Sequence, residues 1–265
     1  MSVTILGLGG SLRAGSTTTL ALHIALAGAR EAGAQTRLID LATLCLPLFD
    51  GTYSLDGYAP ADRAAMTTLL DAADEAHGVI LASPTYHGTI SGALKNALDI
   101  LEVATDDAGS RLGGKVAGLM AVQGGTSGTG VNTLTTMLLA ARAMGAWVAP
   151  TMVSIPGSRE AFDDAGVASS SDIDRRLRAL GAEVARASAL HATPWSERAA
   201  RDTVDDGWLT QPTGFPLIVG ESLGVSWPGK AELARRRGPT GARAVQVDNT
   251  TTERQEGAWR ANASR

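Results

Sequence analysis

The sequence predicts an α/β fold built on a doubly wound, five-stranded parallel sheet. Five short apolar stretches rich in β-branched residues alternate along the chain with five longer stretches of helical periodicity. The short stretches are apolar along their length, which is typical of strands that are covered on both faces. Because right-handed crossovers join successive strands of such a repeat, helices are expected on both faces of one sheet.

The expected strands and helices follow one another between residues 3 and 190. Each strand is marked by a stretch rich in apolar or β-branched residues, and Pro84 ends the third one. The expected strands are VTILGLG at 3–9, TRLIDL at 36–41, GVILASP at 78–84, KVAGLMAVQ at 115–123 and WVAPTMVSI at 147–155. Helical spacing of apolar residues predicts helices at 17–32, 61–76, 91–103, 131–144 and 171–190.

The pattern breaks beyond about residue 193. The segment 194–265 is rich in Pro, Gly and Trp, and it holds one short apolar stretch, FPLIVG, among polar and arginine-rich residues. We therefore expect one domain at 1–193 and an irregular C-terminal extension at 194–265, part of which is disordered.

The composition favours a globular protein and excludes several classes. Of 265 residues, 44% are hydrophobic and 19% charged, and the net charge of -4 argues against nucleic-acid binding. The absence of an apolar run of about 18 residues and of a secretion leader predicts a cytoplasmic protein without a membrane segment. Cys45 is the only cysteine, and its apolar setting predicts a buried side chain. The scattered histidines lack metal-ligand spacing, so no metal site is expected.

Residues 10–19, GGSLRAGSTT, lie between the first strand and the first helix and form a candidate phosphate-binding loop. A dinucleotide-binding turn would carry a third glycine where Leu12 stands, and an NTPase loop would carry a lysine where Ser16 stands. The loop instead combines one arginine with hydroxyl side chains, namely Ser11, Arg13, Ser16, Thr17, Thr18 and Thr19. Hydroxyls, an arginine and the N-terminus of a helix together suit a phosphate monoester. A helix cap alone would need only one of these hydroxyls, so the phosphate interpretation is favoured.

Two further loops are expected at the same edge of the sheet, because ligands bind at the carboxyl ends of parallel strands. SPTYHGTISGALKNALD follows the third strand, where Tyr86 and His87 offer flat groups that can bracket a planar ring. QGGTSGTG follows the fourth strand, where Gly124 and Gly125 allow the backbone to approach a ligand edge. A phosphate at one end and a flat ring at the other describe flavin mononucleotide (FMN).

Four stretches together resemble a known family, the NAD(P)H-dependent FMN reductases of flavodoxin-like fold. They are GGSLRAGSTT, DLATLCLPLFD, SPTYHGTISGALKNALDIL and QGGTSG, which occur in the order of the family. The resemblance covers residues 1–190 and implies a flavodoxin-like sheet with FMN and NADPH or NADH as cofactors.

The resemblance also assigns residues to parts of the cofactor. It implies that the FMN phosphate is held by Ser11, Arg13, Ser16, Thr17 and Thr18. It implies that the isoalloxazine ring is lined by Pro84, Thr85, Tyr86 and His87, and that its pyrimidine edge meets Gln123, Gly124, Gly125 and Thr126. The chain departs from the common family pattern at Thr85, His87 and Ser91. No catalytic acid or base is expected, because a flavin itself performs hydride chemistry.

The implied activity is hydride transfer from a nicotinamide nucleotide to FMN, with the electrons passed to a small acceptor. The resemblance implies that this acceptor is a free flavin, which would serve a flavin-dependent monooxygenase, or a quinone-like compound, an azo dye or a metal oxyanion. It also implies a homodimer or homotetramer. The alternatives are a flavodoxin-like electron carrier without enzymatic activity and a nucleotide-binding scaffold without redox chemistry. Electron carriers tend to cover the flavin with bulky aromatic side chains, and Tyr86 is the one such residue in these loops, which favours the enzyme.

Overall fold

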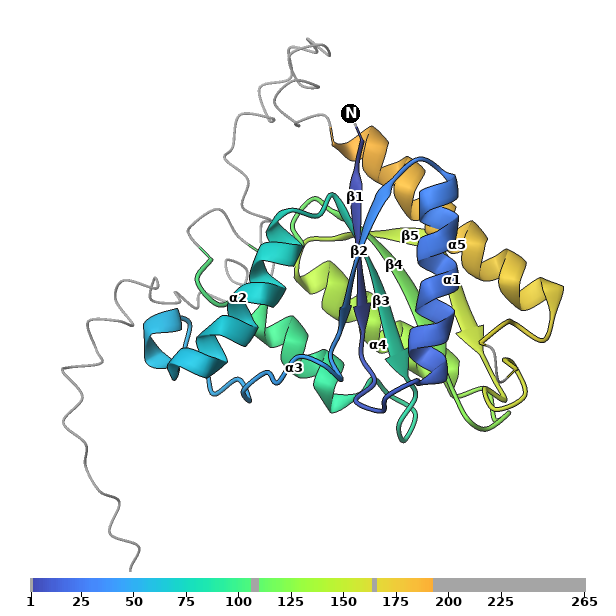
Figure 1. Ribbon diagram of the computed structural model, residues 1–265, viewed down its shortest axis with the longest axis horizontal. Coiled ribbons are helices and arrows are strands. Elements are labelled where there is room, and N and C mark those ends of the chain that lie inside the picture. The colour runs from blue at the N-terminus through green and yellow to red at the C-terminus, as the bar shows by residue number, and fades with distance from the viewer. Residues whose placement is uncertain (1, 106–109, 164–165, 193–265) are drawn as a thin grey trace, which may run out of the picture. The chain divides into compact units, whose positions relative to one another are not determined.

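The computed structural model describes residues 2–105, 110–163 and 166–192, and the expected extension at 194–265 lies outside these residues. The doubly wound, five-stranded parallel sheet is confirmed, with strand order β2-β1-β3-β4-β5 (Figure 1). The strands are β1 (Thr4–Gly9), β2 (Gln35–Asp40), β3 (Gly78–Pro84), β4 (Val116–Val122) and β5 (Trp147–Ile155). This order is that of the flavodoxin-like fold.

Helices cover both faces of the sheet. The helices are α1 (Thr17–Glu31), α2 (Pro60–Asp74), α3 (Gly92–Ile100), α4 (Gly130–Ala143) and α5 (Ser171–His191), with a short 3-10 helix, η1 (Leu55–Gly57), before α2. One apolar core lies between the sheet and α1 and α5, and the other between the sheet and α2, α3 and α4 (Figure 1). No helix of the described residues is long and apolar enough to cross a membrane.

Burial differs between the central and the edge strands. Every residue of β3 and β4 is buried, because each strand is flanked by neighbours and covered by helices on both faces. The edge strands β2 and β5 are only partly buried, and Trp147 at the start of β5 is 61% exposed. The unbroken apolar runs of the sequence therefore predict the central strands most directly.

Helices α1 and α5 cross at unusually close range, because glycines stand at the crossing point. A Cβ atom added at Gly181 would collide with the carbonyl oxygen of Ala25, and one added at Gly28 would collide with that of Arg178. The absence of these side chains brings the two backbones together and fixes where α1 lies on the sheet.

Two expectations differ from the structure. The third helix was expected at 91–103 but ends at Ile100, where the backbone changes to tighter turns in which the Glu102 amide donates to the Asp99 carbonyl and the Val103 amide to the Ile100 carbonyl. The carbonyl oxygens of Leu101, Val103 and Ala104 then accept hydrogen bonds from the Arg111 guanidinium. Cys45 was expected to be buried but is exposed, because the surface segment after β2 turns its neighbouring leucines inward and Cys45 outward.

Candidate functional site

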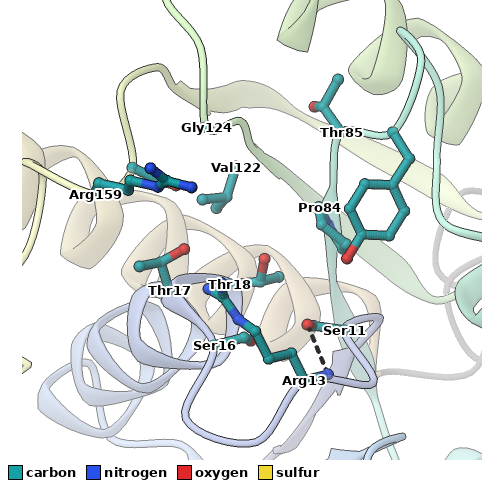
Figure 2. A pocket seen from close by; sticks show the side chains of 12 residues that line it. Ser11, Arg13, Ser16, Thr17, Thr18, Pro84, Thr85, Val122, Gly124 and Arg159 are labelled. Atoms are coloured by element: carbon teal, nitrogen blue, oxygen red, sulfur yellow. Dashed lines mark hydrogen bonds between the residues drawn. The ribbon is translucent and has the colours of Figure 1, made fainter.

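A cavity of about 180 Å³ opens at the carboxyl edge of the sheet, between the loops that follow β1, β3, β4 and β5 (Figure 2). It is lined by Ser11, Arg13, Ser16, Thr17, Thr18, Pro84, Thr85, Tyr86, Val122, Gly124, Ser158 and Arg159. All five predicted phosphate-binding residues line this cavity, and so do four residues predicted to contact the ring. The lining contains no histidine and no carboxylate.

The loop after β1 presents an anion-binding helix end. Ser16 caps α1 by accepting a hydrogen bond from the Thr19 amide at 3.1 Å, and the first turn of α1 carries no acidic residue. Gly15 has a φ of 61°, which a residue with a side chain rarely adopts. The free N–H groups and the dipole of α1 therefore face the cavity without a carboxylate of the first turn to offset them.

The Arg13 side chain faces the same cavity (Figure 2). Among the described residues it has no ion-pair partner within 4.0 Å, whereas Arg37, Arg111 and Arg178 each pair with a carboxylate. Its charge is thus available to an anionic ligand.

The loop after β3 combines a fixed start with an exposed tip. The Thr85 amide donates to the Val122 carbonyl at 2.8 Å, and its hydroxyl accepts a 3.0 Å hydrogen bond from Thr133 of α4. Tyr86 and Thr89 exchange backbone hydrogen bonds of 3.0 and 3.1 Å, which leaves His87 and the following glycine as a two-residue turn. Both turn residues have positive φ, as such turns require.

Tyr86 and His87, the two flat side chains predicted to contact the ring, lie differently with respect to the cavity. Tyr86 lines the cavity and is 50% exposed, so one part of its ring is open to a ligand. His87 is exposed at the tip and does not line the cavity. The flat surface offered to a planar ligand is therefore that of Tyr86.

The loop after β4 is shaped by the buried side chain of Gln123. Its amide nitrogen donates to the Gly125 carbonyl at 2.9 Å, and its amide oxygen accepts hydrogen bonds from the Gly130 amide and the Thr129 hydroxyl. Gly124 lines the cavity with no atom within 4 Å of where a Cβ would stand. Gln123, Gly125 and Thr126 are not among the residues that line the cavity, and both ends of the Gln123 amide bond to the loop itself.

The loops after β1 and β3 are joined by serine hydroxyls. Ser91 caps α3 and donates from its hydroxyl to the Gly10 carbonyl at 2.6 Å. The Ser91 amide in turn donates to the Ser83 hydroxyl at 3.0 Å. The loop after β1 is thereby tied to the start of α3.

The structure adds three residues that the sequence-based reasoning missed, namely Val122, Ser158 and Arg159. Ser158 and Arg159 belong to PGSR, which directly follows β5. The rule that ligands bind at carboxyl ends of strands could have found them, had it been applied to the fifth strand as well as to the first, third and fourth.

The residues fit a flavin mononucleotide in chemistry. The hydroxyls of Ser11, Thr17 and Thr18 and the Arg13 guanidinium stand around the helix end that would hold the phosphate. Tyr86 and Gly124 offer a flat face and an unshielded backbone to a ring. A site without its own acid or base suits a ligand that brings the reactive group with it.

Comparison with known families assigns the chain. The sequence profile described as NADPH-dependent FMN reductase matches residues 3–160, which is more than half of the chain. The chain belongs to this family. Its sequence resemblance and its flavodoxin-like fold are confirmed, and membership places this FMN reductase homologue among oxidoreductases that use FMN and a nicotinamide nucleotide.

Curated relatives agree with the family. An NADPH-dependent FMN reductase, ArsH, of Shigella flexneri is 32% identical over 189 residues, which cover 71% of this chain and 69% of the relative. An NADPH azoreductase of a Bacillus species is 38% identical over 120 residues, or 45% of this chain. The alignment spans 61% of the azoreductase, which is less than two thirds of its length.

A solved structure is similar as well. The apo form of the NADH:FMN oxidoreductase EmoB is 25% identical and superposes with a TM-score of 0.54. The match covers 70% of this family member and 90% of EmoB.

Proposed function

We propose that this protein is an NAD(P)H-dependent FMN oxidoreductase that passes electrons to a small acceptor. The observation that supports this most is the single cavity that joins the phosphate-binding loop, with its unpaired Arg13, to Tyr86 and the open backbone at Gly124. When bound, FMN would supply the hydride and electron-transfer chemistry, which the side chains of the site do not themselves provide.

The side chains of the site bind and orient rather than react. The α1 amides, the Thr17 and Thr18 hydroxyls and Arg13 hold the phosphate monoester, which fixes one end of the cofactor. Tyr86 covers part of the ring, and the backbone beside Gly124 offers N–H groups that stabilise negative charge on the ring edge. The exposed half of Tyr86 leaves room for a second planar molecule.

The acceptor we propose is a free flavin, which would serve a flavin-dependent monooxygenase, or a quinone-like compound. The azoreductase among the relatives supports a small aromatic acceptor. A homodimer or homotetramer and a cytoplasmic location remain predictions, as do the ring contacts of His87, Gln123, Gly125 and Thr126.

Anaerobic mixing of the full chain with FMN and NADPH, and then with NADH, tests the activity. Repeated reduction of added FMN, seen as bleaching of its absorbance, is the expected result, and the faster of the two nucleotides is the preferred donor. Binding of FMN without bleaching would identify an electron carrier instead. No binding of FMN would overturn the proposal.

A matched ligand pair tests the phosphate loop. Arg13→Ala combined with Ser16→Ala is expected to weaken binding of FMN far more than binding of riboflavin, which lacks the phosphate. Equal losses for both ligands would show that this loop does not hold the phosphate.

A further inference from the structure

Arg159 is the least expected residue of the cavity, because it comes from the loop after β5. Figure 2 shows its guanidinium entering from the opposite side to Arg13, with Thr17 drawn between the two arginines and Thr18 beside the end of the Arg13 side chain. Both arginines line the same cavity. Two guanidinium groups therefore flank the helix end that the proposed function assigns to the phosphate.

The loop that carries Arg159 is held in place by backbone hydrogen bonds. The Gly157 amide donates to the backbone carbonyl of Gly125 at 3.0 Å, and the Ser158 amide donates to the backbone carbonyl of Gln123 at 2.9 Å. These bonds dock the segment after β5 on the glycine loop after β4. Arg159 is thus attached to a fixed part of the site, although its side chain is exposed.

The residues that line the cavity carry positive charge and no carboxylate, and the Asp40 carboxylate lies behind the lining, where it accepts a 3.5 Å hydrogen bond from the Thr19 hydroxyl of α1. Among the residues that the structure describes, neither Arg13 nor Arg159 has a carboxylate within ion-pair distance, and the cavity lining contains none. Two guanidinium groups and the positive end of α1 make the site strongly cationic. A phosphate monoester carries about -1.5 to -2 charges at pH 7, which one arginine does not neutralise.

We propose that Arg159 is a second ligand of the cofactor phosphate and binds it from the side opposite Arg13, with the buried Ser158 beside it on the same wall. The inference rests on the proposed function, because it assumes that FMN occupies the cavity. It assigns the loop after β5 to cofactor binding, in addition to the three loops predicted from the sequence.

The test measures binding rather than turnover. FMN and riboflavin are titrated into the full chain by flavin fluorescence for the wild type, Arg159→Ala and Arg159→Lys. Arg142→Ala is the control, because Arg142 is an exposed arginine in the last turn of α4, without an ion-pair partner among the described residues. Arg159→Ala is expected to weaken FMN binding about tenfold, as for one partly exposed charge-assisted hydrogen bond. Riboflavin binding should not change, Arg159→Lys should recover part of the loss, and the control should match the wild type.

The outcomes separate this inference from the proposed function. An unchanged FMN affinity in Arg159→Ala, with a loss in Arg13→Ala, would overturn the role of Arg159 and leave the phosphate loop intact. If neither arginine affects the preference for FMN over riboflavin, the phosphate site itself is wrong. A higher KM for NADPH but not for NADH, with FMN affinity unchanged, would assign Arg159 to the dinucleotide and overturn the inference.

Discussion

The glycine at the crossing of α1 and α5 makes a sharp prediction for stability. In Gly181→Ala, the new Cβ would collide with the Ala25 carbonyl oxygen, and it would lie 2.7 Å from the Ala25 carbonyl carbon and 2.9 Å from the Ala29 nitrogen. Real Cβ contacts essentially never fall below 3.0 Å. Because the atoms that it meets belong to a helix backbone, no rotamer change can relieve the clash, and the two helices must separate.

The size of the effect follows from two opposing terms. Overpacking of a core against atoms that cannot rotate away costs about 3 kcal/mol, the upper part of the usual range. Alanine is favoured over glycine inside a helix by about 1 kcal/mol. We therefore expect the free energy of unfolding to fall by about 2 kcal/mol. With a urea m-value of about 2 kcal/mol/M, the unfolding midpoint should fall by about 1 M.

Urea unfolding followed by far-ultraviolet circular dichroism measures this shift. Gly92→Ala is the matched control, because Gly92 stands at the start of α3 with no atom within 4 Å of its added Cβ. The control should unfold at the wild-type midpoint or slightly above it. If Gly181→Ala also unfolds there, the close crossing of α1 and α5 does not exist in solution.

Two further predictions concern the site and the far end of the sheet. Gln123→Ala leaves the buried Gly130 amide without its acceptor, so the glycine loop should loosen and weaken FMN and riboflavin equally, by about tenfold in a fluorescence titration. An effect on FMN alone would contradict the assignment of this loop to the ring. Burial lowers the pKa of Lys115 from 10.5, so the folded state holds this proton less tightly than the unfolded state does. The free energy of unfolding of the wild type, relative to Lys115→Met, should therefore rise as the pH increases from below the lowered pKa towards 10.5, as measured by urea midpoints across that interval. A difference in free energy of unfolding between wild type and Lys115→Met that stays constant across this pH interval would refute the lowered pKa of Lys115.

The central strands β3 and β4 were predictable because every one of their residues is buried, which requires an unbroken apolar run in the sequence. A run such as GVILASP allows little besides a central strand, and the structure places β3 at the same residues. The end of α3 could not be predicted in this way. Apolar spacing continues past Ile100, but the backbone there forms tighter turns, and Arg111, well beyond the helix in sequence, donates to carbonyls past the last helical turn. Side-chain interactions between distant residues leave no periodic signal.

The site shows the same division. That the loop after β1 lines the cavity was predictable, because hydroxyls, an arginine and a helix start stand together in one short stretch. The hydrogen bonds of the Gln123 side chain to its own loop could not be predicted. A glutamine amide can bond to a ligand or to the backbone, and the bonds seen here depend on the positions of Gly125 and Gly130 in the folded chain. Arg159 could not be predicted as a cavity residue from its own stretch, PGSR, because that stretch has no distinctive composition. Its place in the cavity depends on how the fold brings the loop after β5 next to the other loops.

The serine bridge between the loops after β1 and β3 has a thermodynamic consequence. Ordering a residue's backbone costs about 1 to 2 kcal/mol in conformational entropy. Since Ser91 already fixes Gly10 within the folded chain, this cost is met during folding and not on ligand association. An anionic ligand that binds this loop, as we propose for the phosphate, would therefore enter a preorganised site, and more of the intrinsic interaction energy would appear as affinity.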